Sequence, residues 1–291
     1  MKNSFFLLHF AVMLAGFTGV FGKLISLNEG LLVWYRVFFS FVFVFFIIKV
    51  FGISDSTTFK DKFGIAKVGM ILTLHWVFFY ASIKYSNISI GVVCYCLTSF
   101  FTAVFKPLID RTKFKFSELL LSVLTLLGIS LIFHFDVTYQ LGIALGVISS
   151  AFSALYTIYN ERLVRIYDSK IINYYQMIGG TVGWGILLPV YLYFFPVQNL
   201  LPGLKDSLYL LSLSLFCTVG LYILFAEVLK KIPAFTVNLS FNLEPIYAIT
   251  LAFLFFGESN EVNFSFYVGL FFIMMSVILQ SAISVRKGLR L

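Results

Sequence analysis

Charged residues are scarce in this sequence. Asp, Glu, Lys and Arg make up 12% of its 291 residues, about half the share that is usual in soluble domains. Only three cysteines occur, Cys94, Cys96 and Cys217, and all three fall inside apolar runs. An odd number of cysteines with no pair in the loops excludes a disulfide framework. The sequence leaves no stretch that would form a soluble domain.

The signature motifs of soluble enzymes are also missing. The sequence contains no P-loop, no H-E-x-x-H pair, no glycine-rich dinucleotide fingerprint after a strand, and no Cys/His metal spacing. We therefore expect a protein that is not an enzyme and that holds no cofactor and no metal. Without an ATP-binding domain, this chain cannot use ATP directly to drive transport.

Long apolar runs dominate what is present. Hydrophobic residues make up 60% of the sequence, and Phe alone occurs 37 times. About 20 apolar residues cross a bilayer as a helix, whereas a β-barrel needs shorter segments that alternate in polarity. The runs do not alternate, so we predict an all-α membrane protein with ten transmembrane helices. The ten runs lie at 5–22, 31–50, 66–84, 89–109, 117–135, 139–160, 172–195, 207–229, 235–256 and 264–284.

The first run resembles a secretory signal peptide, because an apolar stretch follows a short N-terminal segment with one basic residue, Lys2. It lacks an A-x-A-like cleavage site, and further apolar runs follow it at once. Both features favour a retained membrane helix over a cleaved signal. We therefore count 5–22 as the first span.

The net charge of +8 is distributed unevenly. Sixteen of the 21 Lys and Arg lie at the two termini and in every second loop, and only Lys23, Lys84 and Lys205 lie in the other loops. Positive loops mark the cytoplasmic side of a membrane protein. We expect a multi-pass protein of the plasma (inner) membrane with both termini cytoplasmic. The basic loops then determine topology and contact membrane lipid, and we expect no nucleic-acid partner.

The two halves of the chain resemble each other weakly. At an offset of 145 the fourth run aligns with the ninth and Ser99 falls against Glu244, and "VWYR" in the second run resembles "NYYQ" in the seventh. Each half would hold five spans, so the second copy would enter the membrane from the opposite side. Inverted repeats of this kind recur in secondary transporters. We predict two inverted five-helix repeats, at 1–136 and 137–291.

One stretch carries the most specific resemblance to a known family, "NLEPIYAITLAFLFFGE" at 242–258. It is similar to the Glu-Pro motif, apolar run and Gly-Glu end of EamA-type modules in the drug/metabolite transporter superfamily. "LVWYRVFFS" and "NERLVR" resemble further parts of that family, and the resemblance covers essentially the whole chain. The first half departs from the motif, with Ser99 where the second half has Glu244. The resemblance implies a transporter of small metabolites such as amino acids, with export as the direction.

A carboxylate and a proline lie near the middle of the ninth run. A charge at this depth costs about 2.5–3.5 kcal/mol on insertion scales, so something must offset it. Pro245 leaves the carbonyl of Phe241 unpaired, which is tolerated only beside a cavity or inside protein. We interpret Pro245 as a hinge and Glu244 as a substrate-binding or coupling residue. A structural bond to a neighbouring helix is the alternative for Glu244.

Two asparagines on the same run are further candidates for substrate binding or coupling. Asn238 and Asn242 are four residues apart and share a face of the helix that Glu244 does not. One of these stripes can line a cavity while the other meets a neighbouring helix. The sequence leaves open which stripe does which.

Arg36 and His75 complete the candidates that can carry charge. Arg36 is interpreted as a snorkelling surface residue, as an anchor for a substrate carboxylate, or as a partner for Glu244. His75 lies near the centre of the third run, where an imidazole can relay a proton or contact a ligand. A bond from His75 to a neighbouring backbone is the alternative.

Aromatic and hydroxyl side chains would supply the remaining contacts of a central site. Aromatic rings offer apolar and cation–π contacts, although any single ring in so aromatic a sequence is also a packing candidate. Glu227 is expected to pair at the surface with the nearby "LKK", and Glu258 to be solvated. The substrate-binding candidates of the aromatic and hydroxyl kind are Trp76, Tyr80, Tyr95, Ser99, Tyr156, Tyr159 and Tyr222.

These features together predict a secondary-active exporter that works by alternating access around a midplane cavity. Coupling to protons stays open, as does the choice between a monomer and a homodimer. Two other classes of function also stay open. One is a flippase or membrane-embedded transferase for a lipid-linked substrate, against which the scarcity of acidic residues outside the basic loops counts. The other is a structural or sensor protein that transports nothing.

Overall fold

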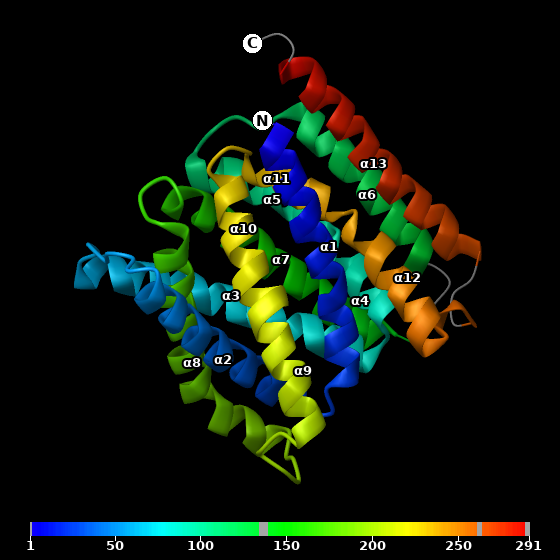
Figure 1. Ribbon diagram of the computed structural model, residues 1–291. Coiled ribbons are helices and arrows are strands. Elements are labelled where there is room, and N and C mark those ends of the chain that lie inside the picture. Colours follow the sequence, from blue (N-terminus) through cyan, green and yellow to red (C-terminus); the bar gives the residue numbers. More distant parts are fainter. Residues whose placement is uncertain (1, 134–138, 261–263, 289–291) are drawn as a thin grey trace.

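The computed structural model describes residues 2–133, 139–260 and 264–288. Within these ranges the chain is a bundle of helices with no strand (Figure 1). The helices are α1 (Lys2–Leu24), α2 (Glu29–Val50), α3 (Phe59–Tyr85), α4 (Ile88–Tyr95), α5 (Leu97–Asp110), α6 (Phe116–Phe133), α7 (Gln140–Leu163), α8 (Ser169–Phe194), α9 (Leu204–Ser214), η1 (Leu215–Gly220), α10 (Leu221–Leu229), α11 (Ala234–Phe241), α12 (Glu244–Phe256), η2 (Glu258–Asn260) and α13 (Phe264–Gly288).

The predicted all-α class is confirmed, and the chain is a multi-pass membrane protein. Among the described residues, eight helical stretches are long and apolar enough to cross a bilayer. Two shorter apolar helices, Phe116–Leu131 and Phe264–Leu279, correspond to the fifth and tenth predicted runs. Each predicted run therefore coincides with helix over most of its described length, while residues 134–135 of the fifth run lie outside the described residues.

Three of the runs are not continuous α-helices. The ninth run breaks between α11 and α12, and Pro245 lies in the first turn of α12, where its missing N–H leaves no helical bond unmade. The eighth run passes through η1, one stretch of π-helix between α9 and α10. A π-helical stretch inside an α-helix often marks a functional site.

The fourth run breaks at Cys96, between α4 and α5, and no proline accounts for this break. The hydroxyl of Ser99 donates to the carbonyl oxygen of Cys96 at 3.0 Å, in competition with the backbone bonds of a regular helix. Tyr95 and Ser99 lie on either side of this break.

Close helix packing holds the centre of the bundle together. Helix α3 packs against both α7 and α8, and α1 packs against α10 and α12, while α6 and α13 lie side by side at one edge (Figure 1). A Cβ atom on Gly69 of α3 would overlap the backbone of Gln176, and one on Gly179 of α8 would overlap the backbone of Ala66. Small residues of this kind let membrane helices approach closely.

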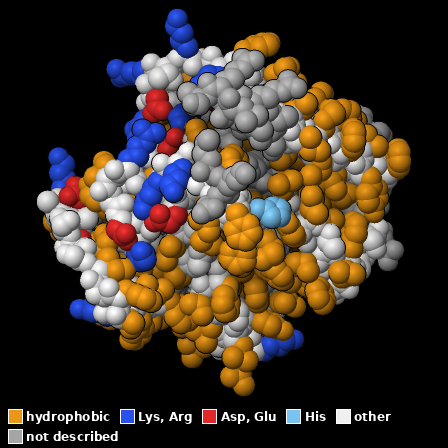
Figure 2. All heavy atoms as spheres, turned by 45° about the horizontal axis from the view of Figure 1, so that its top comes forward, with side chains coloured by type: hydrophobic (Ala, Val, Ile, Leu, Met, Phe, Trp, Pro, Cys, Tyr) orange, Lys and Arg blue, Asp and Glu red, His pale blue; other side chains and the backbone are white. Residues whose placement is uncertain are grey.

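The outer surface is largely apolar, as a lipid-facing surface must be. In Figure 2 hydrophobic side chains cover most of the face in view, and Lys and Arg gather with Asp and Glu on one part of it. Helix α8 exposes a row of large apolar side chains. They are Val182, Ile186, Val190, Tyr193 and Phe194.

The loops fall into two groups, which we name the basic end (loops 51–58, 111–115, 164–168 and 230–233) and the opposite end (loops 25–28, 86–87 and 195–203). At the basic end, Arg162 of α7 pairs with Asp110 of α5, and Ser169 of α8 donates to Glu227 of α10 at 2.5 Å. Glu227 also pairs with Lys230 at 2.6 Å, so its predicted surface partnership with "LKK" is confirmed.

At the opposite end, the prediction that Glu258 is solvated is wrong. Its side chain is fully buried and pairs with Lys23 at the end of α1 at 2.8 Å. It also accepts bonds from the backbone N–H groups of Ile88 and Ser89 and from the Ser89 hydroxyl. The carboxylate therefore satisfies N–H groups that the first turn of α4 leaves free, where the helix dipole favours an anion.

Candidate functional site

A small cavity of about 30 Å³ lies in the middle of the bundle. This is room for about one water-sized molecule. The residues around it come from both halves of the chain. They are Ala15 and Thr18 of α1, Arg36 of α2, His75, Trp76 and Phe79 of α3, Tyr95 of α4, Leu221 and Tyr222 of α10, Phe241 of α11 and Glu244 of α12.

Arg36 carries a buried positive charge to this cavity. Its guanidinium donates to the hydroxyl of Thr218 at 2.7 Å, the hydroxyl of Tyr80 at 2.8 Å and the carbonyl of Cys217 at 3.0 Å. Its Cζ lies 3.8 Å from the centroid of the Trp76 ring, a cation–π contact. The side chain is 1% exposed, so the snorkelling interpretation is wrong.

The π-helix η1 explains how the sequence can bury this arginine. Thr218 and Cys217 belong to η1, where the backbone pattern is shifted from that of a regular helix. The carbonyl of Cys217 accepts from Arg36. All acceptors of the guanidinium are neutral, and among the described residues no carboxylate lies within 4.0 Å of it. The interpretation that Arg36 pairs directly with Glu244 is therefore wrong.

Glu244 carries a carboxylate to the same cavity. It is the first residue of α12, directly after the break in the ninth run, and it is 3% exposed. Within the described part of the chain, no hydrogen bond or ion pair to its side chain is present. A carboxylate and a guanidinium thus face one enclosed space without contacting each other, which leaves both able to bind a third group.

His75 is held by α7. Its Nδ1 lies 3.0 Å from the carbonyl oxygen of Ser149 and 2.8 Å from the Ser149 hydroxyl. A carbonyl only accepts, so Nδ1 donates in that bond, and in the neutral ring Nε2 is then the acceptor. The ring packs on Tyr95, with the centroids 5.4 Å apart. The backbone-bond alternative is therefore realised, although His75 also lines the cavity.

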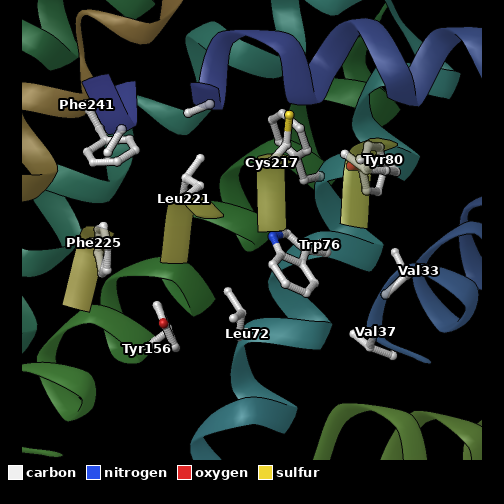
Figure 3. Close-up of a cluster of buried hydrophobic side chains, with 14 of the residues drawn as sticks. Val33, Val37, Leu72, Trp76, Tyr80, Tyr156, Cys217, Leu221, Phe225 and Phe241 are labelled. Carbon is white, nitrogen blue, oxygen red and sulfur yellow. The ribbon is translucent and has the colours of Figure 1, made fainter. Parts of the chain in front are cut away.

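Aromatic rings separate the cavity from the basic end. The indole N–H of Trp76 donates to the hydroxyl of Tyr222 at 3.1 Å, and the rings of Tyr222 and Tyr156 lie 5.8 Å apart. Phe225 stacks on Tyr156 and meets Phe241 edge-on. Figure 3 shows Tyr156, Phe225 and Phe241 grouped on one side of this cluster, with Trp76, Tyr80 and Cys217 on the other.

The two asparagines of α11 and its cap face neighbouring helices, not the cavity. Asn238 donates to Thr102 of α5 at 2.8 Å and accepts from Thr157 of α7 at 3.1 Å. Asn242 donates to Ser99 at 3.4 Å. The question that the sequence left open is thus answered, because the asparagine stripe joins helices and Glu244 faces the cavity.

Four other predicted residues also lie outside the cavity lining, namely Tyr80, Ser99, Tyr156 and Tyr159. Tyr159 packs at the edge of the hydrophobic core, with the Arg162 guanidinium 5.7 Å from its ring. Tyr80 reaches the site only through its bond to Arg36. Ser99 contacts Cys96 and Asn242 at the helix break.

Sequence reasoning missed several residues of the site. Thr18 and Phe241 line the cavity, and Thr218 holds Arg36. None of them carries charge, and single hydroxyl or aromatic side chains give no signal in a sequence with 37 Phe. Among the described residues, no group of three or more His, Cys, Asp or Glu side chains is placed to hold a metal ion.

Comparison with known proteins gives one family. The profile of the EamA-like transporter family matches residues 3–134 and again residues 140–282. An uncharacterized transporter of Clostridium kluyveri is 26% identical over 208 residues, 68% of this chain and 65% of that protein. The uncharacterized transporter YdfC of Bacillus subtilis is 27% identical over 177 residues, 59% of this chain and 56% of that protein. The matches thus span less than two thirds of either relative.

A solved structure shares the fold. A crystal structure superimposes with a TM-score of 0.71 over 97% of this chain and 98% of the other, at 11% sequence identity. Similarity at so low an identity concerns the arrangement of helices alone.

Proposed function

The chain belongs to the EamA-like transporter family, and we propose that it is a secondary-active exporter of small metabolites such as amino acids. The observation that carries this proposal is the central cavity, where the guanidinium of Arg36 and the carboxyl group of Glu244 line one space with no hydrogen bond or ion pair between them. A solute with a carboxylate and an amine matches that pair, with the carboxylate on Arg36 and the amine on Glu244.

The proposed mechanism is alternating access between two inverted five-helix repeats, at 1–136 and 137–291. The broken helices support it. The offset of 145 between the fourth and ninth runs brings the break at Cys96 within one residue of the break at Asn242. Discontinuous helices at equivalent places in two repeats are typical of transporter binding sites.

Ion pairs at the two ends of the bundle support the same arrangement. Lys23 and Glu258 join the first and ninth runs at the opposite end. Lys106 and Glu161 join the fourth and sixth runs, their equivalents in the other repeat, at the basic end. The two pairs join equivalent runs at opposite ends of the bundle with the signs of the charges exchanged, although the offset of 145 assigns Lys113, seven residues after Lys106, to Glu258.

We propose that the basic end is cytoplasmic, with both termini on that side of the plasma (inner) membrane. The excess of Lys and Arg in its loops supports this orientation. The cavity in this structure holds about one water-sized molecule, so a metabolite enters only when the helices around it separate. We assign Pro245, at the start of α12, to the hinge of that movement.

Uptake into proteoliposomes tests the proposal. The assay compares amino acids, small amines and small acids, with and without a pH gradient, for the wild type, Glu244→Gln and the control Glu227→Gln. Glu227 is a carboxylate at the surface of the basic end. We expect saturable uptake that Glu244→Gln impairs and Glu227→Gln spares, and uptake driven by the gradient would assign proton coupling to Glu244. Folded protein that takes up nothing would overturn the proposal in favour of a lipid-directed or non-transporting function.

A further inference from the structure

Four uncharged polar side chains are buried on α7 and α8, outside the central cavity, at 1–2% exposed. Tyr156 and Asn160 are four residues apart on α7, and Asn173 and Gln176 are three apart on α8, so each pair shares a face of its helix. Two bonds link three of them across the helices, from the Tyr156 hydroxyl to Gln176 Oε1 at 3.4 Å and from Gln176 Nε2 to Asn160 Oδ1 at 2.9 Å. Asn173 lies one helical turn from Gln176 on the same face of α8.

This cluster contains one unpaired donor and one unpaired acceptor. Asn160 Nδ2 and Asn173 Oδ1 are buried without a hydrogen-bond partner. Because Gln176 Nε2 donates to Asn160 Oδ1, the Asn160 amide makes one bond and one of its two polar atoms is left over. Buried polar atoms are almost always paired, so each exception calls for an explanation. In a bilayer the cost is greater, since lipid offers no hydrogen bonds.

The cluster adjoins the central site on its basic-end side. The Tyr156 ring contacts the Tyr222 ring, which lines the central cavity. Asn160 and Asn173 lie nearer to the basic end, within four residues of the end of α7 and the start of α8, respectively. A solute moving between the central cavity and the basic end would therefore pass this cluster.

The inverted repeat gives the cluster a counterpart. Gln176 lies seven residues after the start of α8, as Arg36 does after the start of α2, and the similarity of "NYYQ" to "VWYR" pairs them in sequence. Arg36 donates to a tyrosine and a threonine hydroxyl, and Gln176 contacts a tyrosine hydroxyl and an amide. The same place in the second repeat thus holds neutral groups where the first repeat holds a cation.

We propose that Tyr156, Asn160, Asn173 and Gln176 form an inner subsite that binds an uncharged hydroxyl or carboxamide group of the transported solute. Such a group accepts from Asn160 Nδ2 and donates to Asn173 Oδ1, which satisfies both unpaired atoms. None of the four side chains is ionisable near neutral pH, so the subsite offers no counter-ion to a charged group. The solute role of the subsite rests on the proposed transport function.

Cysteine labelling tests the access of solute to the subsite. Asn160→Cys is compared with Ile158→Cys, a buried position on another face of the same helix, in right-side-out and inverted membrane vesicles. A membrane-impermeant methanethiosulfonate is the probe, and the wild type gives the background from its three buried cysteines. We expect Asn160→Cys to react at least about tenfold faster than Ile158→Cys, and faster from the basic-end face. Equal rates would overturn the proposal.

Protection from labelling tests the chemistry of the subsite. L-threonine, L-glutamine and propionamide are compared with L-valine and L-leucine, which have similar shapes but no side-chain hydrogen-bonding group. We expect the hydroxyl and amide probes to slow the labelling of Asn160→Cys, and Asn173→Leu in the same background to reduce that protection about tenfold, as loss of a buried hydrogen bond predicts. Labelling that no hydroxyl or amide probe slows would reduce the cluster to an ordered-water site and overturn the proposal.

Thermal unfolding separates a binding role from a structural one. Asn173 Oδ1 has no partner, so Asn173→Leu leaves the melting temperature unchanged or raises it if the group is kept for binding. A lower melting temperature with unchanged protection would assign the cluster to packing. Protected labelling in a protein that transports nothing would retain the subsite and overturn only the transport function.

Discussion

Arg36 and Gln176 lie at equivalent places in the two halves of the chain, and their surroundings differ in a consistent way. Arg36 is a cation held by three neutral acceptors and a tryptophan ring. Gln176 is a neutral amide within a group of neutral polar side chains. One helical framework thus carries a charged site toward the opposite end and a neutral site toward the basic end. In the proposed inverted repeat, the two copies therefore differ in the chemistry of this place.

The ends of the bundle differ in a similar way. Glu258 at the opposite end is fully buried and makes one ion pair and three further hydrogen bonds. Glu161 at the basic end pairs with Lys106, and its side chain is 7% accessible. Removing one partner of a buried, hydrogen-bonded pair is costly, because the groups left behind lose their partner. Removing Glu258 therefore leaves more groups unpaired than removing Glu161.

The largest effect is expected from removing the difference in charge between Arg36 and Gln176. Arg36→Gln gives the first repeat the neutral side chain of the second. We expect kcat/KM for uptake to fall about 100-fold, because hydrogen bonds to a charged group contribute about 1.5–3 kcal/mol each. Arg36→Lys should not restore transport, since an ammonium group cannot reproduce the planar geometry of the three guanidinium hydrogen bonds. Wild-type uptake by folded Arg36→Gln would remove Arg36 from the site.

The two ends can be compared by matched substitutions. Glu258→Gln leaves Lys23 without its partner and weakens the cap of α4, so we expect the free energy of unfolding to fall by about 2–3 kcal/mol. Glu161→Gln should cost about 1 kcal/mol or less, because among the described residues its carboxylate caps no helix N-terminus and pairs only with side chains that are partly in solvent. Melting temperatures in detergent measure both, and an equal loss would contradict the difference between the ends.

The close contact of α3 with α8 brings the two halves together near Gln176. A Cβ on Gly69 would overlap the Gln176 backbone, whereas one at Gly64 on the same helix would meet nothing within 4 Å. We expect Gly69→Ala to lower stability by about 1–3 kcal/mol through overpacking and Gly64→Ala to leave it unchanged. Thermal unfolding of the two variants measures this difference in stability. An unchanged melting temperature for Gly69→Ala would show that α3 and α8 separate easily at this contact.

The smallest effect concerns the two helix breaks. Pro245→Ala restores an N–H that can bond to the carbonyl of Phe241 and join α11 to α12. We expect the maximal uptake rate to fall about two- to fivefold, with KM unchanged, if opening and closing limits the rate. Cys96→Ala at the break in the first repeat should have no such effect, since no proline maintains that break. Unchanged rates in both variants would exclude Pro245 as a hinge.

Much of the fold could be predicted from residue properties alone. Apolar runs long enough to cross a bilayer become helices there because no other isolated segment satisfies its own backbone. The break in the ninth run followed from Pro245. The break at Cys96 and the π-helix η1 could not be foreseen, because no residue type in either stretch marks them; the Cys96 carbonyl accepts from the Ser99 hydroxyl and the Cys217 carbonyl accepts from Arg36.

The sequence by itself determined that this is a helical membrane protein and that Arg36, His75 and Glu244 are costly to bury. Only the tertiary structure decided which groups compensate them. Arg36 is held by Thr218, which lies 182 residues away along the chain. The sequence likewise could not tell whether Glu244 or Asn242 faces the cavity. Hydropathy is a property of each segment, whereas the partner of a buried polar group depends on which distant helix packs beside it.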